Sequence, residues 1–200
     1  MIIRIFSCVI LLLINPSISF SQDFHAGIRA GMSASQVSGD RLSGFDKAGI
    51  VFGGFVGRNF SEKISGQMEI SFIQKGSRSS VNKEDNSYYR MRLHYIQVPV
   101  LFQYKVGKKI DLEVGPSAGV LVFSEENDQL GLINNTPPFE DMDVSFNAGG
   151  SYQIGEHWTF NARYSASILP VRKFQGSYNF NFFDRGQYNE LIELAFLYRF

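Results

Sequence analysis

Apolar and polar residues alternate one by one along several stretches of this chain, and this period of two constrains the fold more than any other feature. In residues 64–72 the apolar side chains share one face, and the only charged residue, Glu69, falls on the other. The same alternation returns over residues 110–122 and 158–168. A period of two is typical of strands with one apolar face. The sequence therefore predicts an all-β chain.

Five further segments fit strands less strictly, at residues 24–34, 50–60, 89–106, 144–152 and 188–200. The second of these is glycine-rich and apolar on both faces, so its register is undecided. The third changes phase, because Met91, Leu93 and Tyr95 share one face, which Ile96 and Val98 then take over. One extra residue near Tyr95 and Ile96, a β-bulge, reconciles its two halves. We expect eight strands in all.

The connections between the eight segments alternate strictly between short and long. The short ones are residues 61–63, 107–109 and 155–157, and the long ones are 35–49, 77–88, 124–143 and 170–187. Outer-membrane barrels have this alternation, with short periplasmic turns and long outer loops. The sequence predicts an eight-stranded antiparallel up-and-down transmembrane β-barrel with both termini on the periplasmic side.

The alternative is a soluble eight-stranded barrel that carries a small lipid or pigment, because periodicity does not say which face points outward. The apolar faces carry almost no charge, aromatic residues lie near the strand ends, and the chain stops on the aromatic residue Phe200. These features favour a barrel in the cell outer membrane. We expect a monomer in contact with outer-membrane lipid.

Residues 1–21 have the pattern of a secretory signal peptide, with Arg4, an apolar run, Pro16 and small serines. The apolar run is about ten residues long, short of the roughly 20 that a retained membrane helix needs. A lipoprotein is a second alternative, but the only cysteine, Cys8, lies inside the apolar run. We expect cleavage before Gln22 and a single barrel domain over residues 22–200.

The chain after cleavage has 18 basic and 19 acidic residues, since Arg4 leaves with the signal peptide, and it has no cysteine. A net charge of 18 − 19 = −1 argues against nucleic acid as a partner. The lack of cysteine excludes disulfides and thiolate metal sites. We expect no cofactor. The acidic loop 124–143 leaves cation binding open, although it lacks the fixed spacing of a calcium loop.

Four stretches resemble the PorT-like outer-membrane β-barrel family: LHYIQVPVLFQYKVG at 93–107, MEISFIQKG at 68–76, LEVGPSAGV at 112–120 and ARYS at 162–165. The most specific part is the run from Tyr95 to Pro99 followed by Tyr104 and Lys105. Gln97 stands there where the family more often has an acidic residue. The resemblance covers nearly the whole chain after the signal peptide. It implies an outer-membrane barrel, linked in some members to protein secretion or gliding, and it implies no reaction.

Catalytic patterns are sparse. Of the three histidines, His94 alone falls at a height where it could activate a nucleophile against membrane lipid. No serine or acid stands beside it at a recognisable spacing. We therefore expect a non-enzymatic structural or binding protein that acts through its outer loops. A lipid-modifying enzyme and a small channel are the alternatives.

Three sets of residues carry the site predictions. The alternation places eight charges on the inward face, where they need partners: Arg29, Glu69, Arg92, Asp111, Glu113, Arg163, Glu193 and Arg199. Aromatic residues of the fourth long loop are expected to contact an unidentified protein or glycan: Phe174, Tyr178, Phe180, Phe182 and Phe183. The last strand is expected to carry the signal for the barrel assembly machinery: Phe196, Tyr198 and Phe200.

Overall fold

The computed structural model describes residues 24–40, 42, 44–79, 88–133, 136–173 and 186–200. The expected signal peptide lies outside these residues. The strands are β1 (Phe24–Ser38), β2 (Lys47–Asn59), β3 (Ile64–Arg78), β4 (Tyr89–Lys105), β5 (Ile110–Asp128), β6 (Gly131–Leu132), β7 (Met142–Gln153), β8 (Trp158–Ser167) and β9 (Tyr188–Arg199). In this described part no helix is long and apolar enough to cross a membrane.

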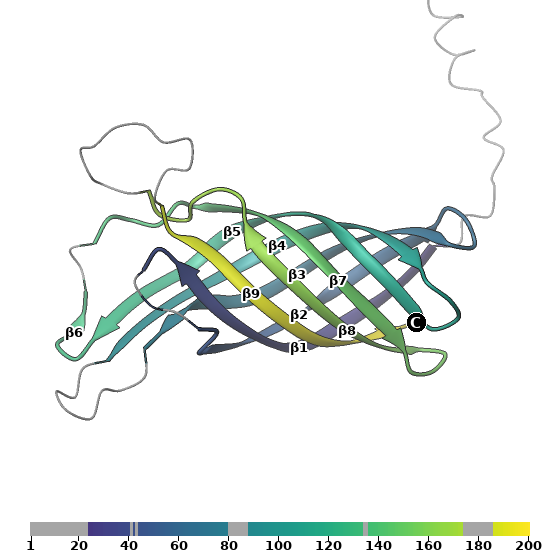
Figure 1. Cartoon of the computed structure of the whole chain (residues 1–200), viewed down its shortest axis with the longest axis horizontal. Helices are drawn as coiled ribbons and strands as arrows, with labels where there is room; N and C mark the ends of the chain where they lie inside the picture. The colour runs from purple at the N-terminus through teal and green to yellow at the C-terminus, as the bar shows by residue number, and fades with distance from the viewer. Residues whose placement is uncertain (1–23, 41, 43, 80–87, 134–135, 174–185) are drawn as a thin grey trace, which may run out of the picture.

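The strands form a closed antiparallel barrel (Figure 1). Their order in the sheet is β4, β3, β2, β1, β9, β8, β7 and β5, and the pairing of β4 with β5 closes the ring. β6 has two residues and pairs only with the end of β5, so it adds no ninth strand to the wall of the barrel. The prediction of an eight-stranded antiparallel barrel is confirmed.

The two ends of the barrel differ. The short connections lie at one end, which we call the turn end, and the long connections lie at the other, which we call the loop end (Figure 1). Gly107 supports one tight turn with a φ of 95°, a left-handed conformation that suits glycine. The first and last described residues, Phe24 and Phe200, both lie at the turn end, where the Phe200 amide donates to the Ala26 carbonyl over 3.0 Å.

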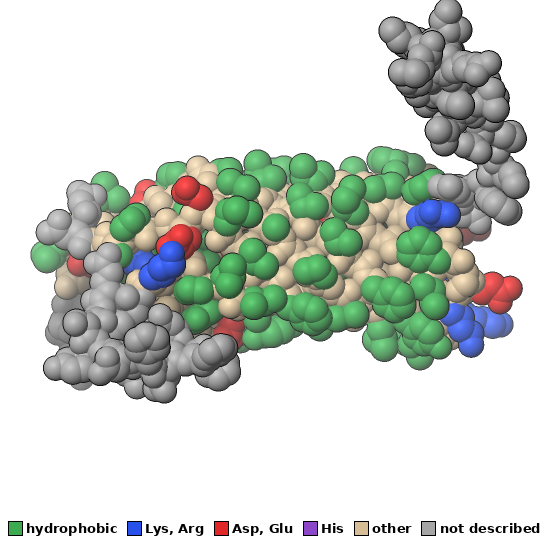
Figure 2. Space-filling view, turned by 90° about the horizontal axis from the view of Figure 1, so that it is seen from above, with side chains coloured by type: hydrophobic (Ala, Val, Ile, Leu, Met, Phe, Trp, Pro, Cys, Tyr) green, Lys and Arg blue, Asp and Glu red, His purple; other side chains and the backbone are tan. Residues whose placement is uncertain are grey.

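The outer surface of the barrel is apolar around its middle. Figure 2 shows hydrophobic side chains over this part of the visible face, with charged side chains toward its two ends. Large apolar side chains from every strand of the barrel are solvent-exposed here, among them Ile28, Phe52, Ile70, Val100, Leu112, Phe146, Tyr164 and Leu194. We call this surface the apolar belt. A protein in water has no reason to expose so continuous an apolar band, whereas a barrel in lipid requires one.

Several strands run farther toward the loop end than the sequence predicted. β1 continues to Ser38, β3 to Arg78 and β5 to Asp128, where we expected ends at 34, 72 and 122. These extensions lie above the apolar belt, where the outer face is polar. The contrast between two faces then disappears, and with it the sequence signal for a strand.

The predicted phase change in β4 is wrong. Its inward side chains alternate without interruption, and Met91, Leu93 and Tyr95 are fully buried inside the barrel together with Gln97. The register does shift between His94 and Tyr95, but the extra residue lies in the partner strand β5. The sequence pattern predicted the wrong face because the lumen is apolar at the level of Met91, Leu93 and Tyr95. Apolar side chains therefore belong to the inner face in the upper half of β4 and to the outer face in the lower half.

β2, whose register was undecided, follows the same rule of alternation. Val51 and Phe55 are buried in the lumen, while Ile50, Phe52 and Val56 are exposed in the apolar belt. Both faces of β2 are apolar because one meets lipid and the other meets the apolar part of the lumen.

Candidate functional site

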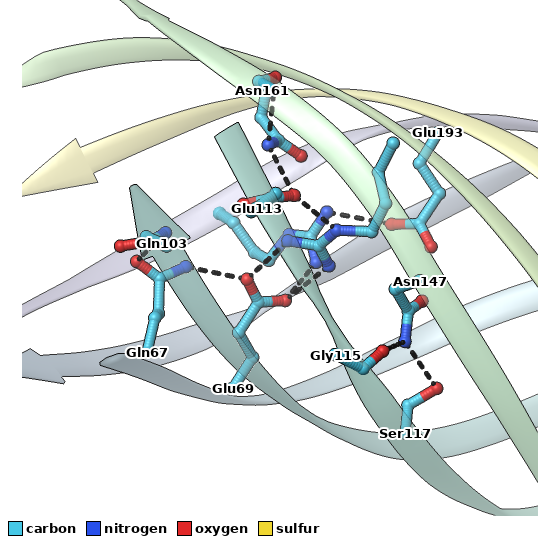
Figure 3. Close-up of polar contacts among 12 residues, drawn as sticks. Gln67, Glu69, Gln103, Glu113, Gly115, Ser117, Asn147, Asn161 and Glu193 are labelled. Atoms are coloured by element: carbon cyan, nitrogen blue, oxygen red, sulfur yellow. Dashed lines mark hydrogen bonds and ion pairs between the residues drawn. The ribbon is translucent and has the colours of Figure 1, made fainter. Parts of the chain in front are cut away.

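The lower half of the lumen, toward the turn end, is filled by a network of buried ion pairs (Figure 3). We call it the charged layer, and its members are Arg29 (β1), Glu69 (β3), Glu113 (β5), Arg163 (β8) and Glu193 (β9). Each of these residues is at most 4% exposed. All five come from inward positions of the strand alternation, so the pleat of the sheet directs them to one place.

Arg163 holds the charged layer together across the barrel. Its Nη1 and Nη2 donate to the two carboxylate oxygens of Glu69 over 2.9 and 2.8 Å, and its Nε donates to Glu113 over 2.7 Å. Arg29 donates to Glu69 and, over 2.8 Å, to Glu193. Glu69 therefore accepts from both guanidinium groups. The network ties together strands that are not neighbours in the sheet, since β8 and β3 lie on opposite sides of the ring.

Amide side chains add hydrogen bonds around the charges. Gln67 donates to Glu69 over 2.7 Å and Asn161 donates to Glu113 over 2.9 Å. Higher in the lumen, Asn147 donates to the Gly115 carbonyl and to Ser117 over 3.1 and 3.0 Å. Charges removed from water persist when they are paired and hydrogen-bonded. Each member of the charged layer has at least one ion pair, while Arg29 Nε, Glu113 Oε2 and Glu193 Oε1 are buried without a hydrogen-bond partner among the described residues.

The structure brings five of the eight predicted inward charges into this layer and places three elsewhere. Arg92 lies on the outer face of β4, where it pairs with Glu125 at 3.4 Å, because the phase change assumed for β4 does not exist. Asp111 and Arg199 lie at the turn end, where they line the mouth of the barrel instead of its centre. Both residues occupy inward positions of their strands, β5 and β9, but they lie too close to the turn end to be enclosed.

A second buried ion pair was missed by the sequence analysis. Lys75 on β3 donates to Asp143 on β7 over 2.9 Å, and both side chains are at most 1% exposed. Ser145, Ser167 and Asn189 also donate to Asp143. The signal was present, because Lys75 continues the alternation Glu69, Ser71, Ile73 beyond the predicted end of β3, and Asp143 directly precedes a predicted strand.

Over the whole described lumen the buried charges balance. The buried basic residues are Arg29, Lys47, Lys75, Arg163 and Arg172, and the buried acidic residues are Glu69, Glu113, Glu126, Asp143 and Glu193. The five charges of each sign cancel, although the charged layer alone has two arginines for three glutamates. Charge balance is therefore reached over the full height of the lumen and not within one network.

The upper half of the lumen is packed with apolar side chains. We call it the apolar layer, and its members are Val37, Val51, Ile73, Met91, Leu93, Tyr95 and Leu191, all at most 1% exposed. The Lys75 ammonium lies 5.2 Å from the centre of the Tyr95 ring, which joins this layer to the second ion pair. The lumen is thus occupied by side chains at both levels.

The loop end of the lumen is closed by one further ion pair. Arg172 follows β8 and donates to both oxygens of Glu126 on β5 over 3.0 and 2.5 Å, and its guanidinium lies 3.7 Å from the centre of the Phe139 ring. Burial alone would raise the pKa of Glu126, but hydrogen bonds from Arg172, Thr136 and Tyr89 outweigh it and hold that pKa below its ordinary value. The carboxylate form of Glu126 therefore fastens the third and fourth long connections together.

The acidic residues of the third long loop are largely occupied by basic partners. Glu126 pairs with Arg172, Asp143 with Lys75 and Glu140 with Lys173 at 3.1 Å. In the part of the chain that the structure describes, no group of three or more His, Cys, Asp or Glu side chains is arranged to hold a metal ion. Ion pairing within the protein thus occupies Glu126, Glu140 and Asp143 of this loop.

The turn end carries a polar pocket of about 430 Å³. Its walls include Asp111, Arg199, His25 and His157, and Gln67 connects it to the charged layer. His157 Nδ1 lies 2.9 Å from the Arg199 carbonyl oxygen, so this histidine is tied to the end of β9.

His94, the candidate for catalysis, lies on the outer face of β4. Its ring stacks on Phe123 with centroids 4.9 Å apart and meets the edge of Phe72 at 5.6 Å. Within the described ranges no hydroxyl or carboxylate hydrogen-bonds to it. These contacts suit a residue at the edge of the apolar belt and provide no nucleophile for it to activate.

The remaining predicted sites are placed in part. The aromatic residues proposed for partner contact, Phe174 to Phe183, lie outside the described residues. The proposed assembly signal lies on the outer face of β9 at the turn end, with Phe196 half exposed and Phe200 73% exposed. Trp158 and Tyr198 pack together there with ring centroids 5.0 Å apart, as in an aromatic girdle. Recognition of this strand during assembly stays a prediction.

Comparison with known proteins supports the same architecture. A family model described as "Outer membrane protein beta-barrel domain" matches residues 20–172, and a search of curated proteins gives no match. Among solved structures, Ail of Yersinia pestis, in complex with the heparin analogue sucrose octasulfate, is 15% identical, with 88% of this chain and 99% of that chain covered and a TM-score of 0.52. Neisserial surface protein A is 9% identical, with 88% and 97% covered and a TM-score of 0.52. At such identities the likeness is one of fold.

Proposed function

We propose that this chain, which belongs to the outer membrane protein beta-barrel domain family, is a non-enzymatic and non-conducting barrel. It binds a partner at its loop end. The loop end faces the outside of the cell and the turn end faces the periplasm. The alternation of short and long connections supports this orientation, since outer-membrane barrels keep their short turns on the periplasmic side.

The observation that carries the proposal is the filling of the lumen. Bonds from Arg163 to Glu69 cross the ring from β8 to β3, and bonds from Lys75 to Asp143 cross it from β3 to β7. Eight strands enclose only enough space for side chains, and here those side chains are bonded across it. Because the lumen is filled in this way, the loop end is the surface that remains available to a partner outside the cell.

At the loop end, β3, β4 and β5 extend beyond the apolar belt. On β4 the apolar belt ends at Ile96, and the strand continues from His94 up to Tyr89. At about 3.3 Å per residue and a tilt of about 40°, this extension rises roughly 15 Å. β3 and β5 extend beside it, and the ribbon that includes β6 reaches farther at the loop end than the other strands (Figure 1).

Planar-bilayer recordings of the purified protein test the closed lumen. The protein should insert and show no steady conductance. A large, steady ohmic conductance would contradict the proposal and favour the channel, because ions need a continuous aqueous path. A Lys173→Gln protein, changed only at an exposed ion pair, provides the matched control for insertion.

Complementation tests the binding role. In cells that lack the gene, the wild-type protein and the Lys173→Gln variant should restore the envelope permeability of wild-type cells. A variant with residues 174–183 replaced by a flexible segment of equal length should reach the membrane in normal amounts and fail to restore it. Full restoration by the loop variant would show that residues 174–183 bind no partner that the envelope requires and that the barrel is structural.

A part in protein secretion or gliding is a finer proposal, supported by the resemblance of residues 93–107 to PorT-like proteins. Its test is the amount of secreted protein and the movement of cells without the gene. Unchanged secretion and movement would remove it, and would leave the closed barrel untouched.

A further inference from the structure

The outer face of the barrel carries a cluster of arginines directly above the apolar belt. We call it the basic patch, and its members are Arg78 on β3 and Arg90 and Arg92 on β4. Arg78 and Arg90 stand opposite each other in the ladder between the two strands, and Arg92 follows Arg90 two residues on, on the same face. Like charges placed directly opposite are unfavourable in a sheet unless an anion lies between or beside them.

The described residues offer this cluster little negative charge. Glu125 pairs with Arg92 at 3.4 Å, and both side chains are partly exposed. Arg78 and Arg90 have no ion pair within the described ranges, and the Nε atoms of Arg90 and Arg92 are buried without an acceptor there. Among the described residues, three positive charges therefore meet one negative charge.

A fourth basic residue, Lys47, lies behind the basic patch on the inward face of β2. Lys47 begins β2 above the apolar belt, and its pKa is lowered first by burial and then by the charges of Arg90, Arg92 and Arg78. Its ammonium donates to the Ala48 carbonyl over 2.9 Å and has no carboxylate among the described residues. Lys47 therefore adds positive charge behind the basic patch and supplies it with no anion.

The height of the basic patch matches a lipid phosphate. On β4 the ten residue-to-residue steps from His94 to Tyr104 rise about 25 Å at about 3.3 Å per step and a tilt of about 40°, which is about the height of the apolar band of an outer-membrane barrel. Arg92 and Arg90 come next along the strand. Below them the rings of Phe72, His94 and Phe123 pack in a row, as aromatic residues do at a membrane interface.

The patch is confined to one side of the barrel. On the opposite side, Glu190 of β9 occupies the position above Ile192 of the apolar belt and accepts from Gln36, Ser38 and Tyr164. That side presents a carboxylate to the same membrane level. A general attraction to anionic surfaces would not need such asymmetry, whereas a bound lipid would.

We propose that Arg78, Arg90 and Arg92 bind the phosphates of a phosphorylated outer-leaflet lipid whose acyl chains lie against the apolar belt of β3, β4 and β5. Guanidinium groups bind phosphate through paired N–H donors, and the apolar side chains Ile70, Ile96 and Val122 below them are exposed to receive acyl chains. The proposal rests on the orientation proposed above.

Binding of bis-phosphorylated lipid A to the full mature protein tests this site. The protein is held in a maltoside detergent, which contains no phosphate, and lipid A is titrated with native mass spectrometry as the readout. Arg90→Gln should weaken binding about fivefold, which corresponds to about 1 kcal/mol per arginine at a lipid surface, and the double variant Arg78→Gln/Arg90→Gln about twenty-five-fold. Arg90→Lys should retain most of the affinity.

Controls separate the lipid from other causes. Lys173→Gln removes one positive charge at the loop end away from the patch and should change affinity less than about twofold. Excess inorganic phosphate should not displace the lipid. Equal affinity of wild type and double variant, an equal loss in Lys173→Gln, or displacement by inorganic phosphate would each overturn the proposal. Binding in micelles does not depend on the orientation in the cell, so its failure is distinct from a failure of the proposed function.

Discussion

The charged layer and the apolar layer fill the same tube by opposite means. In the charged layer Arg29, Arg163 and three glutamates cross-link strands through directional bonds, so each member depends on the others. In the apolar layer side chains such as Ile73 and Leu93 fill volume without direction. Loss of one charged partner leaves the rest uncompensated, whereas loss of one apolar side chain leaves only a cavity. Stability should therefore respond differently at the two levels.

The largest effect is expected in the charged layer. Arg163→Ala removes the donor shared by Glu69 and Glu113 and leaves their carboxylates buried, at a cost of about 3–5 kcal/mol in the free energy of unfolding. The matched change at an exposed pair, Lys173→Ala, should cost less than about 1 kcal/mol. Urea titration of both variants in lipid vesicles measures the difference. Equal costs would mean that the charged layer is hydrated and does not hold the barrel together.

A somewhat smaller effect is expected in the apolar layer. Leu93→Ala should cost about 2–4 kcal/mol, because Leu93 is fully buried and its removal leaves a cavity between β4 and its neighbours. Leu112→Ala changes the same residue type in the apolar belt, where lipid fills the space, and should cost clearly less. The same urea titration compares them. A larger loss at Leu112 would mean that Leu93 does not lie in the lumen.

The smallest effect concerns the pair that closes the apolar layer at the loop end. The depressed pKa of Glu126 means that its carboxylate form stabilises the folded chain. That contribution is fully present above the ordinary pKa of 4.5 and is lost as the pH falls through the folded value. The stability difference between wild type and Glu126→Gln should therefore be largest at neutral pH and shrink in acid.

Thermal unfolding of the two proteins across this pH range measures the effect, and other carboxylates cancel in the difference. A difference that grows as the pH falls would mean that Glu126 is protonated in the folded barrel and that Arg172 does not hold it.

The two layers also explain which residues could be predicted. Arg29, Glu69, Glu113, Arg163 and Glu193 stand out because a charge on the inner face contrasts with the apolar outer face of the same strand. Met91, Leu93 and Tyr95 were assigned to the wrong face because apolar side chains in the lumen look the same as apolar side chains in lipid. Lys75 and Asp143 were missed because the strands that carry them continue beyond the apolar belt.

The sequence by itself determined the number of strands, their antiparallel order and the alternation of short and long connections. The reason is that a membrane imposes a period of two, apolar outward and polar inward, on every strand of the barrel. Only the tertiary structure decided which side chains meet. Arg163 and Glu69 are 94 residues apart and lie on strands that do not pair, so nothing local relates them. The closure of β4 on β5 brings them together, and closure is a property of the whole ring and of no single strand.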